Sequence, residues 1–292
     1  MALNTADRYR ASMKRPHDFG YALHQPKPFT RLCPGKVGYL DEYQNWHPLL
    51  DLEKPDDIAA EGYTPFILPR HSVPDACQWG PCLSTTTVDT PVDISARGTL
   101  QALGLPAEVT AVVQYRTFTD FGAVLMCDDK VVSEGFDVRS PFLEWLKQNS
   151  GRLLANYPDV KRYGLCAVTW TYSATDIHIK TWTDTDTRVT VGFVSKADPL
   201  AHGGVQTSWA RSQSSSGWFS WNDQKRVIFF TGVKITFGFF GVNEQQERGW
   251  RGVKKDSCFL VTDSALDEDC EAEAEAFGDD WQEIKMATDE NA

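Results

Sequence analysis

The sequence lacks the features that would place it in a bilayer or in a secretory pathway. It contains no apolar run of about 18 residues, the length that a membrane-spanning helix needs. Its N-terminal segment has no apolar core of the signal-peptide kind, and no Asn-x-Ser/Thr glycosylation site occurs. The seven cysteines are scattered, and Cys77 and Cys82 are the only close pair. We therefore expect a reduced, cytoplasmic protein without disulfide bonds.

The short motifs that carry common enzyme chemistry are also missing. There is no Gly-x-Gly-x-x-Gly, phosphate loop, His-Glu-x-x-His or calcium loop. Residues 201–204 resemble an oxyanion-hole loop, but no Gly-x-Ser-x-Gly accompanies them. The histidine and two cysteines of residues 69–82 lack paired ligand spacing, and Asp184 and Asp186 suit a hairpin tip better than a cation site. We predict no enzyme, cofactor or metal, and keep an enzyme without a readable motif as the third hypothesis.

Most of the chain has no excess of charge of one sign. The net charge of −11 lies entirely in residues 263–292, which hold twelve acidic residues against Lys285. Residues 1–262 are neutral overall, so we divide the chain into a body, 1–262, and an acidic tail, 263–292. Nucleic acid is not an expected partner, because an acidic tail repels phosphate.

The acidic tail has two interpretations. Its composition is typical of disorder. However, Phe277, Trp281 and Ile284 follow the i, i+4, i+7 spacing of an apolar helical stripe. The alternative is therefore a short helix that docks the acidic run against a basic part of the body.

The N-terminal 31 residues are basic. Arg8, Arg10, Lys14 and Arg15 favour a short basic helix over residues 5–15, followed by an extended arm. The ordinary expectation is a solvated arm. The alternative is a surface for anionic lipid head groups, to which clustered Lys and Arg are attracted.

The centre of the body reads as a set of short strands. Ten Trp and sixteen Phe favour pleated surfaces. We predict a short helix at residues 55–60 and a hairpin that turns on Asp128 and Asp129. Strands are predicted at residues 37–40, 63–68, 85–99, 109–115, 122–126, 130–138, 205–211 and 227–237, the last buried on both faces. This spacing predicts a mostly antiparallel sheet.

Residues 140–194 give the clearest pattern. A helix is predicted to begin here, with Ser140 as a candidate N-cap and Pro141 at the first helical position. It ends at Tyr157, because the residue before Pro158 is unfavourable for a helix. The apolar face of this helix is predicted to contain Phe142, Leu146 and Leu153, widened by Leu143 and Leu154. The period then changes to two from residue 164 to residue 182. Residues 183–187 favour a turn, so a long two-faced hairpin that returns through residues 189–193 is predicted. Two residues of this predicted hairpin, His178 and Lys180, are expected to face solvent.

This order of elements resembles the pore-forming domain of the gasdermins, especially compact fungal members. The residues that carry the resemblance are the helix 140–157, the strand 163–172 and the strand 227–237. The likeness covers roughly residues 30–240. It implies an α+β fold: a twisted, mostly antiparallel sheet with peripheral helices and long hairpins.

The resemblance also implies a function. Such a protein is an inactive cytoplasmic monomer until its short C-terminal tail is released, for example by an activating protease. It then binds anionic membrane lipids, homo-oligomerises into a β-barrel pore in the plasma or another cellular membrane, and causes programmed cell death in innate immunity. Arg8, Arg10, Lys14 and Arg15 would contact lipid. Phe277, Trp281 and Ile284 would hold the autoinhibitory tail. The lipidated N-terminal cysteine of some prokaryotic members has no counterpart before Cys33.

A second hypothesis is a non-enzymatic β-rich binding module, lectin-like or an interaction scaffold. Its ligand surface would consist of exposed aromatic residues. The candidates are Trp79, Trp209, Trp218 and Trp221.

Overall fold

The computed structural model describes residues 4–14, 18–196, 206–211, 217–239, 258–260 and 270–277. Helices and antiparallel strands occur together in them, which confirms the predicted α+β class. The helices are α1 (Thr5–Lys14), α2 (Pro55–Ala60), α3 (Thr99–Ala102), α4 (Ser140–Asn156) and α5 (Val160–Tyr163). The predicted helices at residues 5–15, 55–60 and 140–157 are thereby confirmed.

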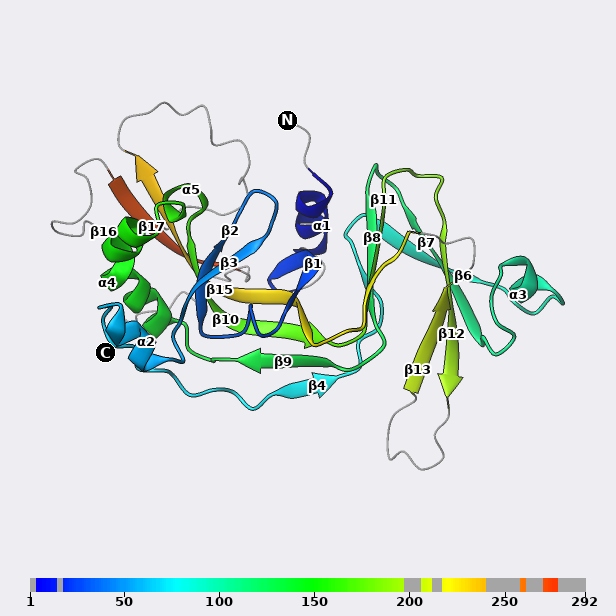
Figure 1. Cartoon of the computed structure of the whole chain (residues 1–292). Coiled ribbons are helices and arrows are strands. Elements are labelled where there is room, and N and C mark those ends of the chain that lie inside the picture. The colour runs from blue at the N-terminus through cyan, green and yellow to red at the C-terminus, as the bar shows by residue number, and fades with distance from the viewer. Residues whose placement is uncertain are drawn as a thin grey trace, which may run out of the picture.

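The strands form three sheets (Figure 1). The large sheet holds β1 (Tyr21–Pro28), β2 (Lys36–Leu40), β3 (Trp46–Asp51), β4 (Asp75–Cys77), β9 (Val131–Gly135), β10 (Leu165–Ala174), β15 (Arg226–Phe239), β16 (Cys258–Leu260) and β17 (Cys270–Phe277). The middle sheet holds β5 (Cys82–Leu83), β8 (Gly122–Cys127), β11 (Ile177–Trp182) and β14 (Phe219–Trp221). The distal sheet holds β6 (Thr87–Val92), β7 (Ala111–Thr117), β12 (Val189–Lys196) and β13 (Gln206–Arg211).

Four long segments of chain each pass through all three sheets. Path 1 is β4–β5–β6, path 2 is β7–β8–β9, path 3 is β10–β11–β12 and path 4 is β13–β14–β15. In every sheet, path 1 pairs with path 2, path 2 with path 3, and path 3 with path 4, always antiparallel. The body is therefore a four-path meander, bent twice along its length.

The register between paths 2 and 3 survives both bends. Trp170 lies opposite Gly135 in the large sheet, Ile177 opposite Cys127 in the middle sheet, and Phe193 opposite Ala111 in the distal sheet. Between the large and the middle sheet this register shifts by one residue, and it is the same in the middle and the distal sheets. Even inside the first bend, the Asp128 N–H donates to the Asp176 carbonyl oxygen at 3.1 Å. The bends therefore deform one continuous pairing without ending it.

Two hairpins predicted from the sequence are wrong. β10, β11 and β12 lie in three different sheets, so the chain does not fold back at residues 183–187. β8 and β9 are likewise separate, and Asp128 and Asp129 form a bend, not a hairpin turn. Alternation identified the strands correctly but carries no information on their partners, which are supplied by distant segments.

The N-terminal segment is part of the body. β1 pairs with β15 in the large sheet, from Tyr21 opposite Phe230 to Pro28 opposite Arg226. In α1, the side chains of Tyr9 and Met13 are fully buried. The solvated-arm expectation is therefore wrong, because this segment contributes a strand and an apolar helix face to the core.

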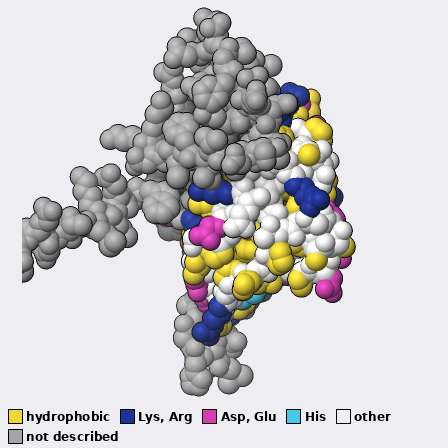
Figure 2. All heavy atoms as spheres, turned by 90° about the vertical axis from the view of Figure 1, so that its left-hand side faces the viewer, with side chains coloured by type: hydrophobic (Ala, Val, Ile, Leu, Met, Phe, Trp, Pro, Cys, Tyr) yellow, Lys and Arg dark blue, Asp and Glu magenta, His cyan; other side chains and the backbone are white. Residues whose placement is uncertain are grey.

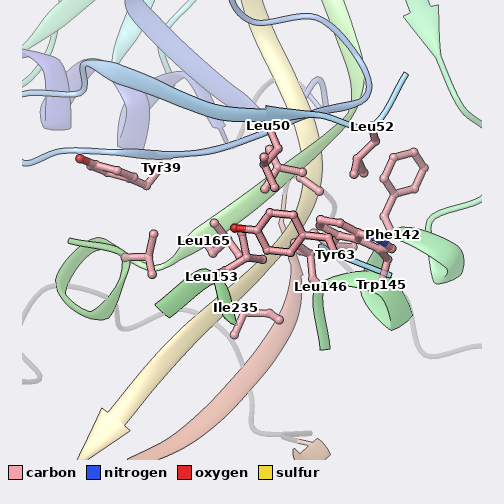
Figure 3. Close-up of a cluster of buried hydrophobic side chains, with 14 of the residues drawn as sticks. Tyr39, Leu50, Leu52, Tyr63, Phe142, Trp145, Leu146, Leu153, Leu165 and Ile235 are labelled. Atoms are coloured by element: carbon pink, nitrogen blue, oxygen red, sulfur yellow. The ribbon is translucent and has the colours of Figure 1, made fainter. Parts of the chain in front are cut away.

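Helix α4 covers the large sheet with the face that the sequence predicted. Phe142, Leu146 and Leu153 are fully buried and meet Leu165 and Ile235 of the sheet (Figure 3). Ser140 is the first helical residue and not the N-cap, a position that Arg139 occupies. At 17 residues, α4 is the longest described helix, and none of the described helices has the length and apolarity that crossing a bilayer requires.

Residues 63–68 form no strand, contrary to the prediction. The backbone of Thr64 is bound instead by side chains of α4: Asn149 Oδ1 accepts its N–H at 2.9 Å, and Trp145 Nε1 donates to its carbonyl oxygen at 2.7 Å. Because these side chains satisfy the backbone groups, the segment lies against the helix without a β partner.

Candidate functional surface

Strand β15 has its two edges occupied in different ways. Path 3 pairs along one edge through β10. On the other edge, β1 covers the start of β15 up to Phe230, and β17 covers it from Gly232 to Phe239. β17 comes from the acidic tail, and β16 pairs in turn with β17. The tail therefore completes the large sheet at its longest strand.

This arrangement differs from both interpretations of the tail. Over residues 270–277 it is neither disordered nor helical, because its backbone adds to the sheet in register with β15. Phe277 lies opposite Gly232 in this pairing, while Trp281 and Ile284 lie outside the described residues. Their role in holding the tail stays a prediction. Without β17, the backbone groups of β15 along this edge would be unpaired, and such an edge is a template for another strand.

The basic residues of α1 are partly engaged within the protein. Arg8 forms an ion pair of 2.8 Å with Asp120 and also donates to its carbonyl oxygen. Arg10 donates to the Tyr21 hydroxyl at 3.2 Å. Lys14 is exposed, and Arg15 lies outside the described residues. The structure thus places three of the four predicted lipid contacts on one short helix, and lipid binding by them stays a prediction.

The four tryptophans proposed as a ligand surface are not exposed. Each is half-buried. Trp79 and Trp221 pack against the core between α1 and the middle sheet, whereas Trp209 and Trp218 pack against Tyr115 and Trp182. Their burial removes the support for an aromatic binding face.

Two buried thiols, Cys82 and Cys127, do not suit nucleophilic chemistry. Burial raises the pKa of Cys82 to about 12, and it also raises the pKa of Cys127. A thiol with a raised pKa is protonated and inert near neutral pH. A hollow of about 790 Å³ beside α3 is lined by residues such as Ile94, Leu100 and Leu105, and no ionisable side chain lines it. Neither feature resembles an active site.

The described part of the face around α4 carries no continuous field of one charge. On its described part, Lys and Arg side chains are interspersed with Asp, Glu and apolar groups (Figure 2). This mixture agrees with the neutral composition of residues 1–262. The tail is therefore held here by backbone pairing, for which the structure gives direct evidence in the register of β17 with β15.

The prediction that His178 faces solvent is wrong. His178 is only 8% exposed, and its ring packs edge-on against Trp209 at 4.8 Å between centroids. Its Nε2 lies 2.9 Å from Asp176 Oδ1 and 3.7 Å from Asp128 Oδ2. No local sequence pattern indicates this cluster, because Asp128 is supplied by a neighbouring path distant in the chain.

Comparison with known proteins gives little guidance. No protein-family model matches the sequence, and no curated protein matches it. Among solved structures, a bacterial gasdermin from Bradyrhizobium tropiciagri matches with probability 0.99, 12% identity and a TM-score of 0.29, covering 75% of this chain and 83% of its own. At this TM-score the likeness supports neither membership of the family nor a function, and it gives no preference for fungal members.

Proposed function

We propose that this protein is a latent, non-enzymatic pore former whose acidic tail restrains it. In the latent state it is a cytoplasmic monomer. After release of the tail, for example by a protease, it binds anionic membranes, oligomerises into a β-barrel pore and kills the cell. The observation that carries this proposal is the four-path meander, in which the same paths stay paired through three sheets and the register between paths 2 and 3 changes by one residue only.

Two antiparallel pairs of paths can lengthen without changing partners. Paths 1 and 2 join through α3 at the distal end, and paths 3 and 4 lie beside them. A strand that spans a bilayer in a barrel needs about 9–11 residues. β10 alone has 10 residues and β15 has 14. Straightening the bends would therefore give a four-stranded antiparallel ribbon long enough to cross a membrane.

The position of β17 explains how the tail would restrain the protein. A barrel closes only when each strand edge finds a partner, and in the latent chain the tail occupies the edge of β15 from Gly232 to Phe239. Removal of the tail would free this edge for a second copy of the chain. It would also remove the whole formal excess of negative charge, which opposes approach to an anionic surface.

Dye leakage from anionic liposomes tests the proposal. The full chain is compared with a chain that ends at Thr262, and with a matched control that ends at Phe277 and so retains β17. We expect leakage from the first truncation alone, with binding that weakens at high salt. If the chain ending at Thr262 is folded and neither binds nor permeabilises vesicles, the proposal fails. Equal leakage by both truncations would locate the restraint outside β17.

A charge reversal on α1 tests the membrane contact separately. Lys14 is exposed, so Lys14→Glu in the chain ending at Thr262 leaves the described ion pairs of α1 intact. Each basic residue near an anionic surface contributes about 1 kcal/mol, so we expect vesicle binding to weaken at least about fivefold. Co-sedimentation with vesicles measures this. Unchanged binding would remove α1 from the lipid-facing surface.

A further inference from the structure

The first bend of the meander brings together three side chains that can bind a metal ion. Asp128 comes from path 2, just after β8, whereas Asp176 and His178 come from path 3 at the start of β11. One ligand atom from each lies within 4.8 Å of the others. The backbone bond from Asp128 N–H to the Asp176 carbonyl holds the two carboxylate residues in place.

The imidazole supplies the observation that points to a ligand. His178 is more than nine-tenths buried, yet its Nε2 has no hydrogen-bond partner, and neither has Asp176 Oδ1. The two atoms are 2.9 Å apart, but their orientation is not that of a hydrogen bond. A buried polar atom without a partner is costly, so a native structure normally satisfies it.

The other ring nitrogen has a partner that suits the tautomer a metal requires. His178 Nδ1 lies 2.8 Å from Ser220 Oγ. When Nδ1 carries the proton and donates it to the serine, Nε2 presents its lone pair to the carboxylates. A second hydrogen bond of this kind is what orients the histidine ligands of metal sites.

The spacing agrees with a small divalent ion. Two ligands held at about 2.0–2.1 Å from a tetrahedral Zn²⁺ lie roughly 3.3 Å apart. The observed separations from Nε2, 2.9 Å and 3.7 Å, lie on either side of that value. The side chains of Asp128 and Asp176 are 37% and 32% exposed, so water can complete the coordination. One imidazole with two carboxylates favours first-row divalent metals such as zinc over calcium or magnesium.

We propose that Asp128, Asp176 and His178 form a site for a divalent transition-metal ion of the zinc class. Because its ligands lie on two paths at the bend between the large and middle sheets, a bound ion pins that bend. This inference concerns metal binding and does not depend on the proposed pore function.

Calorimetric titration of the metal-stripped full chain with Zn²⁺ tests the site. We expect one ion per chain, and a Kd at least about tenfold weaker in Asp128→Asn and His178→Gln, because loss of a supporting residue alone costs 10–100-fold. Asp128 is half-exposed, so Asp128→Asn keeps the test valid if the histidine variant does not fold. Equal affinity in Asp128→Asn and the parent chain would overturn the proposal.

His47 provides a matched control. Its Nε2 lies 3.0 Å from Asp41 Oδ2, a pair similar to that of His178 and Asp176, but the described residues place no second carboxylate in a metal-binding group with it. His47→Gln should therefore bind Zn²⁺ as the parent chain does. If His47→Gln abolishes the binding and Asp128→Asn does not, the proposed site is wrong.

An exposed thiol is the main competing ligand. Cys77 is exposed and unbridged, so Cys77→Ser is titrated in parallel. With Co²⁺ in place of Zn²⁺, the visible spectrum should lack a thiolate charge-transfer band and be unchanged in Cys77→Ser. A band that disappears in Cys77→Ser would assign the metal to the thiol and overturn the proposal.

Thermal unfolding tests whether the ion pins the bend. Zn²⁺ should raise the Tm of the parent chain, since a ligand that binds only the folded state stabilises it. The increase should be lost in Asp128→Asn and retained in His47→Gln. An equal increase in all three would contradict a role for this bend.

Discussion

The two ends of the meander use the same four paths but are covered very differently. At the large sheet, α4 and its neighbours bury an extensive cluster that includes Phe142, Trp145 and Leu153 (Figure 3). At the distal sheet, the described core beneath α3 consists of Leu105, Val109 and Val112, with half-buried residues around it. The four paths pair with one another over similar lengths at both ends, so we expect side-chain packing and the added strands of the large sheet to make that end the more stable. The distal end is therefore the part that opens at the lowest cost.

The largest expected effect comes from removing a core side chain at each end. Phe142→Ala should lower the free energy of unfolding by about 3–5 kcal/mol, because it leaves a cavity in a fully buried site. Leu105→Ala should cost about 2 kcal/mol, since its thin cover can collapse into the space. Urea denaturation measures both values.

Hydrogen exchange gives the control for that pair. Leu105→Ala should accelerate exchange in β6 and β7 and leave α4 protected. A uniform loss of protection across the molecule would show that the two ends unfold as one unit, and the comparison would then be wrong.

Two glycines test the same contrast between the large-sheet end and the distal end. A methyl group at Gly232, in β15, would overlap the backbone carbonyl oxygen of Ala167 in β10. At Gly192, in β12, it would approach both side-chain methyls of Val109, the nearer at 2.8 Å, and a side chain yields more readily than the backbone does. We expect Gly232→Ala to cost about 1–3 kcal/mol and Gly192→Ala less than about 1 kcal/mol. Midpoints of urea unfolding decide this, and a reversed order would mean that the distal end is the rigid one.

Local signals were sufficient for several elements of this fold. The proline near the start of α4, its apolar spacing and the proline after Tyr157 gave its bounds within a residue. The largely buried strand over residues 227–237 was recognisable because it is apolar on both faces. These features depend on neighbours in the sequence, so the sequence alone predicts them.

The partners of these strands could not be predicted from local sequence signals. β11 and β12 read as the two arms of one hairpin because the bend between them and a hairpin turn look alike in sequence. His178 was assigned to solvent since it alternates with Ile177 and Ile179. Its face is covered by Trp209 from path 4 and by Asp128 from path 2, and no local pattern reports residues that arrive from such distances.

The smallest expected effect concerns pH and again separates the two ends. His24, in β1, is 8% exposed and packs between the rings of Tyr9 and Phe219. Burial lowers its pKa from the usual value. The described strands of the distal sheet contain no histidine. Mild acid should therefore loosen the large-sheet end first.

The sign follows from proton binding. Between the lowered pKa of folded His24 and the ordinary value near 6.5, the unfolded chain binds more protons than the folded chain, so stability rises with pH in that window and falls on acidification. His24→Phe keeps the ring packing and removes the titration, so its unfolding midpoint should change less between about pH 7.5 and pH 5.5 than that of the parent chain. If both chains lose the same stability on acidification, His24 is not the group responsible. Because α1 packs on β1 through Tyr9, a confirmed effect would also make the N-terminal helix the first element of the large-sheet end to loosen in acid.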